Sequence, residues 1–131
     1  MAIKDIAANA RQASTRLAAA GGEQKNQALQ AIGQALQDHA QAIIAANQKD
    51  LANAERDNLA ALLKRLKFDQ AKIDGVCEGI QSLIGIADPV GRTLCATELD
   101  TNLELYKVTC PIGVIGVIFE SRPDALVQIS S

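Results

Sequence analysis

Near the end of the chain, a cluster of polar residues follows a strongly apolar run. Glu120–Asp124 come directly after Gly113–Phe119, in which no residue has a polar side chain. Arg122 is the sharpest candidate, because a planar and permanently charged guanidinium matches the geometry of phosphate and carboxylate groups. It stands where a strand is expected to turn into a helix, whose N-terminus also favours anions. The pattern indicates an anion site at Arg122, and a structural ion pair with Glu120 is the alternative.

Cysteine and histidine chemistry has little support in the sequence. Cys77, Cys95 and Cys110 are odd in number and lack C-x-x-C spacing, which argues against both a disulfide framework and a zinc site. Cys77 lies on an apolar helical face and is expected to be a small core residue. His39 is the only histidine, and we expect it to be half-buried and structural. No metal site is predicted.

Composition and charge narrow the possible partners. The 131 residues carry a formal net charge of −2 and show no basic stripe, which argues against nucleic acid or an anionic membrane surface as a partner. No apolar stretch is long enough to span a bilayer, and the N-terminus lacks the apolar run of a signal peptide. We therefore expect a cytoplasmic protein.

The first part of the chain has the apolar spacing of helices, with hydrophobic residues three and four positions apart. The expected helices are one that ends at Gly21 and Gly22, one from Glu23 to about Asn47, one over Leu59–Leu66 and one capped by Asp69. The polar segment 47–57 is expected to contain only a short helical turn. Gly75 and Gly79 weaken the last of these helices, so we expect them to permit close approach of another helix.

A β-hairpin is expected after the helices. Thr93–Leu99 and Leu103–Thr109 are β-prone runs on either side of the turn-forming Asp100–Asn102. The apolar alternation slips between Leu105 and Tyr106, which predicts a bulge there.

The apolar run itself predicts a buried strand over Ile112–Phe119. A strand with two apolar faces belongs inside a parallel sheet that is covered by helices, and ligands collect at the carboxyl ends of such strands. Gly113 and Gly116 do not form a dinucleotide fingerprint and are better explained by close packing. Asp124 is expected to cap a short helix from Ala125. The predicted fold is α/β: N-terminal helices, a β-hairpin and the first strand of an incomplete Rossmann-like sheet.

The segment Cys110–Ile129, with the sequence CPIGVIGVIFESRPDALVQI, resembles the signature of γ-glutamyl phosphate reductase. This family, also called glutamate-5-semialdehyde dehydrogenase, is part of the aldehyde dehydrogenase superfamily. The likeness extends in order through Ala45–Leu51, Leu62–Leu66 and Ala87–Gly91, so it covers essentially the whole chain.

The resemblance implies an oxidoreductase that uses NADPH to reduce L-glutamate 5-phosphate to L-glutamate 5-semialdehyde, with release of phosphate, in proline biosynthesis. Residues 1–131 would be the N-terminal part of the NADPH-binding domain. The implied parts are helices over about 2–87, a hairpin over about 91–109, and the first Rossmann strand with a helix start over about 112–131. A homo-oligomer, with the hairpin at its interface, is implied for the full-length enzyme.

Aligned with the corresponding strand of aldehyde dehydrogenases, Ile118, Phe119, Glu120 and Ser121 fall on the turn that contacts the cofactor. Arg122 falls on the asparagine that helps to form the oxyanion hole, and a guanidinium there could neutralise an acyl phosphate. In the family the nucleophilic cysteine attacks the acyl phosphate. It lies beyond Ser131, so no catalytic residue is assigned in this chain and the fragment alone is expected to be inactive.

Two other functions remain alternatives. One is a non-enzymatic helical interaction module that binds a partner through its hairpin and amphipathic helices. The other is an aldehyde dehydrogenase relative that acts on another acyl donor, such as an acyl-CoA. Glu120–Pro123 argues against the second, since ordinary members have tryptophan and asparagine in this turn.

Overall fold

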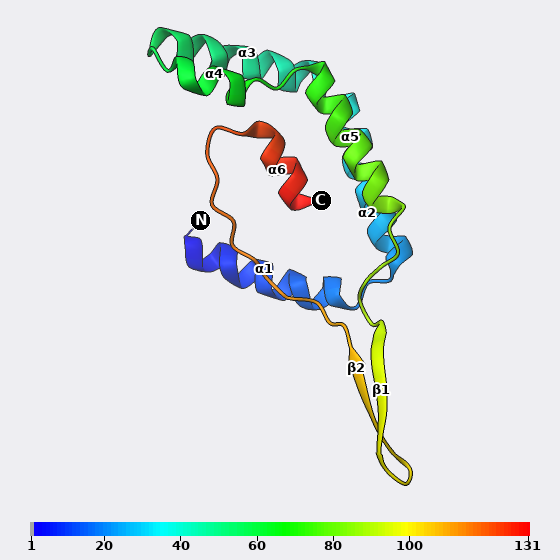
Figure 1. The fold of residues 1–131 in the computed structure, drawn as a ribbon. Coiled ribbons are helices and arrows are strands. Elements are labelled where there is room, and N and C mark those ends of the chain that lie inside the picture. Colours follow the sequence, from blue (N-terminus) through cyan, green and yellow to red (C-terminus); the bar gives the residue numbers. More distant parts are fainter. Residues whose placement is uncertain (1) are drawn as a thin grey trace. The chain divides into compact units, whose positions relative to one another are not determined.

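The computed structural model describes residues 2–131, which form six helices and one two-stranded antiparallel sheet (Figure 1). The chain divides into two compact units. The first contains the N-terminal residues up to Gly22 together with Ala87–Gly116, and the second contains Glu23–Ile86 together with Val117–Ser131. The predicted strand of a parallel sheet is not formed, so the fold described is mainly helical with one hairpin.

In the first unit, helix α1 runs over Ile3–Ala18 and ends shortly before the two glycines that were expected to stop it. At its start, the carboxylate of Asp5 accepts a hydrogen bond from the N–H of Ala2 at 3.1 Å. The apolar stripe of α1 has no partner within this unit: none of its residues is buried, and Ile3 is 84% exposed.

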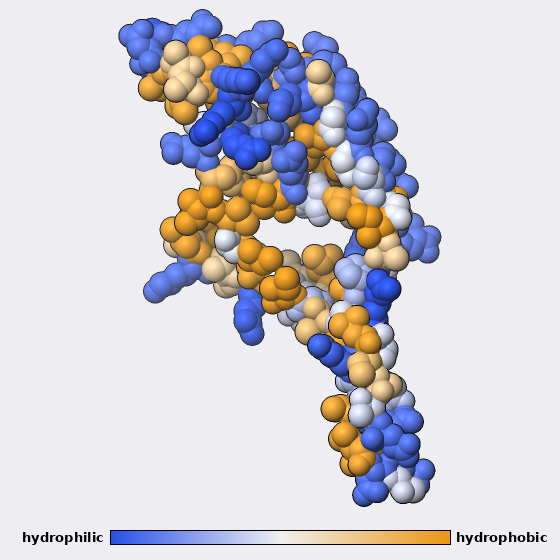
Figure 2. Space-filling model, in the orientation of Figure 1, coloured by the Kyte–Doolittle hydropathy of each residue, from blue (hydrophilic) through white to orange (hydrophobic). Residues whose placement is uncertain are grey.

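The predicted hairpin is confirmed. Strand β1 covers Thr93–Asp100 and pairs antiparallel with β2, which covers Leu103–Val108. Asn102 has a φ of 62° in the turn, a left-handed conformation that asparagine tolerates better than most residues. Every residue of both strands is exposed, and Figure 2 shows hydrophobic as well as hydrophilic residues on the hairpin surface.

The bulge predicted between Leu105 and Tyr106 is wrong in its position. Both irregularities of the ladder lie on β1, at Leu94 and at Leu99, where two residues of β1 face one step of β2. The alternation of residue types on β2 misled the prediction because neither face of this hairpin is buried, and burial is what normally fixes that alternation.

The second unit contains five helices and the core. They are α2 (Gly22–Asp38), α3 (Ala40–Arg56), α4 (Ala60–Leu66), α5 (Gln70–Ile84) and α6 (Pro123–Ser130). Helix α3 contacts both α4 and α5, and α5 contacts α6. The buried core cluster consists of Ala40, Phe68, Ile73, Val76 and Ile80.

The single helix expected from Glu23 to Asn47 is in fact two helices. The chain leaves helical geometry at His39, with a φ of −102° and a ψ of 7°, and α3 then continues to Arg56. His39 is exposed rather than half-buried, and its Nδ1 lies 2.9 Å from the carbonyl oxygen of Ala35. The apolar spacing continues across this break because residues on both sides face the same core.

Asn47 lies inside α3 rather than at the end of a helix, and its side chain is 6% exposed. Its Nδ2 donates to the carbonyl oxygen of Leu66 at 2.8 Å, and its Oδ1 accepts from the N–H of Phe68 at 2.7 Å. A single amide thereby satisfies one carbonyl and one N–H at the turn between α4 and α5. Buried backbone groups need such partners, which explains a polar residue in this position.

The predicted cap of α5 is confirmed. One carboxylate oxygen of Asp69 accepts from the N–H of Lys72 at 3.2 Å, and the other lies 2.7 Å from Nζ of Lys67. The hydrogen bond from Lys67 and then the one from Lys72 hold the pKa of Asp69 below its usual 3.8. Because the pKa of Asp69 is lower in the folded state, its charge stabilises the fold fully when the pH is above the pKa of the unfolded chain. This stabilisation is lost as the pH falls through the pKa of the folded state.

We expect Lys67→Met to raise the pKa of Asp69 toward 3.8, because the substitution removes the largest of the causes that lower it. Titration of the Asp69 carboxyl carbon by NMR measures this directly. Lys64→Met is the matched control, since Lys64 is an exposed lysine on α4 that has no contact with Asp69 among those described. An equal pKa of Asp69 in wild type and Lys67→Met would contradict the assignment.

The predicted strand Ile112–Phe119 is wrong for this chain. Residues 110–120 have no regular secondary structure, and all of them are exposed. A strand is stabilised by hydrogen bonds to neighbouring strands, and the described residues supply no parallel neighbour. The segment therefore exposes large hydrophobic side chains to solvent, and Ile112, for example, is 89% exposed.

Candidate functional site

The predicted cofactor residues lie next to one another on the segment that leads into α6. Ile118 is fully exposed, Phe119 and Glu120 are exposed, and Ser121 is half-buried. Ser121 has a φ of 55°, a left-handed conformation that costs a residue other than glycine about 1 kcal/mol. Strained backbone of this kind concentrates at functional turns. The structure presents these side chains to solvent, and sequence proximity alone brings them together.

Arg122 forms its ion pair with Asp124 rather than with Glu120. Its Nε lies 3.8 Å from Oδ1 of Asp124, and the Arg122 side chain is 54% exposed. Helix α6 begins at Pro123, two residues earlier than predicted, so Asp124 is in its first turn rather than at the cap. Oδ1 of Asp124 also accepts from the N–H of Ala125 at 3.0 Å.

A second cation, which the sequence analysis missed, reaches the same carboxylate. Nζ of Lys72, in the first turn of α5, lies 3.5 Å from Oδ2 of Asp124. The Asp124 side chain is only 13% exposed, so it is largely enclosed at the contact between α5 and α6. Nothing in the sequence near Lys72 indicates this pair, because the two residues come together only through helix packing.

The cluster Arg122, Lys72 and Asp124 can bind an anion. Two cations and one carboxylate leave one net positive charge, and the N-terminus of α6 adds its own preference for negative charge. Because Arg122 uses Nε for its ion pair, the fork of its two terminal nitrogens is turned to no partner that the described residues provide. These two nitrogens can bind a phosphate group with two parallel hydrogen bonds.

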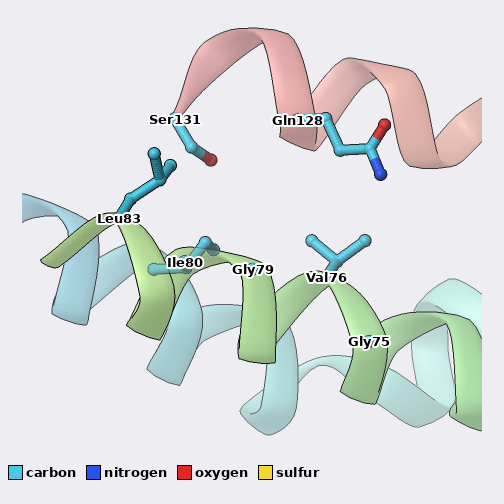
Figure 3. Close-up of a pocket in the computed structure, with 7 residues that line it drawn as sticks. All are labelled: Gly75, Val76, Gly79, Ile80, Leu83, Gln128 and Ser131. Carbon is cyan, nitrogen blue, oxygen red and sulfur yellow. The ribbon is translucent and has the colours of Figure 1, made fainter. Parts of the chain in front are cut away.

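A groove lies between α5 and α6, at the opposite end of α6 from Arg122. It has a volume of about 130 Å³ and is lined by Gly75, Val76, Gly79, Ile80, Leu83, Gln128 and Ser131 (Figure 3). A Cβ atom added at Gly75 or Gly79 would meet no atom within 4 Å. Within the described residues, the close helix approach predicted for these glycines is therefore not realised.

The three cysteines are divided between the two units: Cys77 is in the second, and Cys95 and Cys110 are in the first. Cys77 is half-buried and its Sγ lies 3.7 Å from the carbonyl oxygen of Gly33, which agrees with a core residue. Cys95 and Cys110 are exposed. Residues 2–131 contain no group of three or more histidine, cysteine, aspartate or glutamate side chains that could hold a metal ion. Nor do they contain a helix that is long and apolar enough to cross a membrane.

No protein-family model matches the chain. Individual curated proteins match it along its whole length. A curated gamma-glutamyl phosphate reductase from Pelotomaculum thermopropionicum is 63% identical over 132 aligned residues, which are 100% of this chain and 30% of that protein. The protein of the same name from Trichodesmium erythraeum is 46% identical over 97% of this chain and 30% of its own length.

Solved structures agree with these sequence matches. The crystal structure of gamma-glutamyl phosphate reductase from Saccharomyces cerevisiae matches with a TM-score of 0.91 and 44% identity, over 96% of this chain and 32% of that chain. The structure from Thermotoga maritima matches with a TM-score of 0.88 and 31% identity, over 92% and 30%.

The fold therefore defines a helical segment with a β-hairpin, and this fold recurs in two solved gamma-glutamyl phosphate reductases. Over its whole length the chain is homologous to the gamma-glutamyl phosphate reductases, which confirms the family resemblance. It spans about 30% of the length of the curated relatives it matches.

Proposed function

We propose that this chain is the N-terminal part of an enzyme that uses NADPH to reduce L-glutamate 5-phosphate to L-glutamate 5-semialdehyde, with release of phosphate, in cytoplasmic proline biosynthesis. The observation that carries the proposal is the 63% identity to a gamma-glutamyl phosphate reductase across all of the chain. The positively charged cluster at Arg122 is a second observation that fits the proposal, because the proposed substrate carries a phosphate group and such a cluster attracts phosphate.

In this proposal the chain binds the substrate and does not supply the nucleophile. Arg122 binds the phosphoryl oxygens through its terminal nitrogens and stabilises the negative charge that gathers on them as the acyl–phosphate bond breaks. The attacking thiolate comes from a part of the enzyme outside this chain, as the family resemblance implies.

The residues of the turn suit a dinucleotide. Ile118 and Phe119 offer exposed apolar surface to an aromatic ring, and the carboxylate of Glu120 can accept hydrogen bonds from ribose hydroxyls. The half-buried Ser121 provides a further hydroxyl next to the start of α6. When bound, NADPH would supply the hydride, and the part of these residues is to hold and orient it.

We also propose that the full-length enzyme is a homo-oligomer that uses the hairpin. A two-stranded sheet is marginal by itself, and here both strands are exposed along their whole length. Their outer edges carry backbone groups that are free to pair with another strand.

The function is tested with a full-length protein that contains this chain, by following oxidation of NADPH and release of phosphate. L-glutamate 5-phosphate should support both, in equal amounts. An acyl-CoA donor should support neither, because it brings no acyl phosphate to the Arg122 cluster. Equal or faster turnover with the acyl-CoA would favour a different aldehyde dehydrogenase relative, and no turnover with either donor would favour a non-enzymatic role.

A further inference from the structure

We infer that Asp124 is a positioning residue for Arg122: it holds the guanidinium by Nε, so that the terminal nitrogens face the phosphoryl group. This inference rests on the proposed function. The 3.8 Å contact between Nε of Arg122 and Oδ1 of Asp124 is the observation that suggests it. The contact is an ion pair at a distance too long for a hydrogen bond, and it engages Nε, so the two terminal nitrogens stay available to a phosphoryl group.

Asp124 is well suited to fix another side chain because it is itself fixed. Its carboxylate is largely enclosed, and Oδ1 accepts from the N–H of Ala125 at the start of α6. Oδ2 is held from the other side by Lys72, which belongs to α5. Arg122 is more than half exposed, so its long side chain gains its orientation chiefly from this contact.

Lys72 explains how a carboxylate can stand beside an anion site without cancelling it. Asp124 and Arg122 alone would be neutral, and a phosphate group would gain little from them. With Lys72 the cluster keeps one net positive charge. The three residues thus separate two tasks: Asp124 orients the arginine, and Lys72 balances the charge of Asp124.

The test uses the full-length reductase in the reverse direction, where inorganic phosphate is a substrate and its KM reports on the phosphate site. Asp124→Asn keeps an oxygen for the N–H of Ala125 but removes the charge. Simple charge attraction predicts a lower KM for phosphate, since the site becomes more positive. Positioning predicts the opposite, a KM raised by about tenfold, and Asp124→Glu should recover part of the loss.

Arg122→Ala separates this inference from the proposed function. If Arg122→Ala leaves the KM for phosphate unchanged, the proposed role of the cluster fails. If Arg122→Ala raises it but Asp124→Asn lowers it or leaves it unchanged, only the positioning role is overturned.

In the Arg122→Ala background, Asp124→Asn should have no further effect on the KM for phosphate, because the side chain that it positions is gone. An equal effect in both backgrounds would refute positioning. Asp124→Ser also keeps a small acceptor at the start of α6 and replaces the Asn variant if that protein does not fold, with the same expected outcomes.

Discussion

Arg122→Ala in the full-length reductase should lower kcat/KM for L-glutamate 5-phosphate by about 10²-fold, because it removes the group proposed to stabilise charge on the departing phosphate. The kcat/KM of Arg122→Lys should lie between those of wild type and Arg122→Ala, since an ammonium keeps the charge but lacks the planar fork. Steady-state rates of NADPH oxidation over a range of acyl phosphate concentrations measure both effects.

Arg65→Ala is the matched control for this experiment. Arg65 is an exposed arginine on α4, and it is not among the residues that the structure shows in an ion pair with Asp124. It should therefore leave kcat/KM within about twofold of wild type. Similar losses in the Arg122 and Arg65 variants would point to general charge effects and not to a phosphate site.

Asn47→Ala should lower the free energy of unfolding by about 3 kcal/mol, because it leaves the buried N–H of Phe68 and the carbonyl of Leu66 without partners. This is a large share of the stability of an ordinary domain. Urea denaturation followed by far-ultraviolet circular dichroism measures it. Asn47→Asp should also destabilise, since a carboxylate oxygen would then face the carbonyl of Leu66.

Asn53→Ala provides the comparison within the same helix. Asn53 is exposed on α3, and alanine has the higher helix propensity, so the free energy of unfolding should stay the same or rise slightly. If both substitutions had the same small effect, the two hydrogen bonds of Asn47 would not hold the turn between α4 and α5.

The elements that could be predicted from the sequence are those with local causes. Asp69 caps α5 through the N–H of a residue three positions later, and the hairpin turn is made by Asp100–Asn102 themselves. Helix α4 follows from a dense run of leucines. Each of these signals is contained within a few neighbouring residues.

The elements that were missed depend on distant contacts. The burial of Asn47 makes sense only once the turn before α5 is known to lie against α3. The same holds for Lys72, whose part in the candidate site depends on the packing of α6 against α5. The apolar segment 110–120 shows the converse: its composition favours a buried strand, but strands form only with partners.

The amide of Asn47 also bears on the order in which the chain folds. It joins positions only 19 and 21 residues apart, so closing that loop sacrifices little chain entropy. The contact between Lys72 and Asp124 spans a far longer stretch. During synthesis on the ribosome, α3 can therefore pack against α4 and the turn before α5 first. Helix α6 is made later and can then dock on α5.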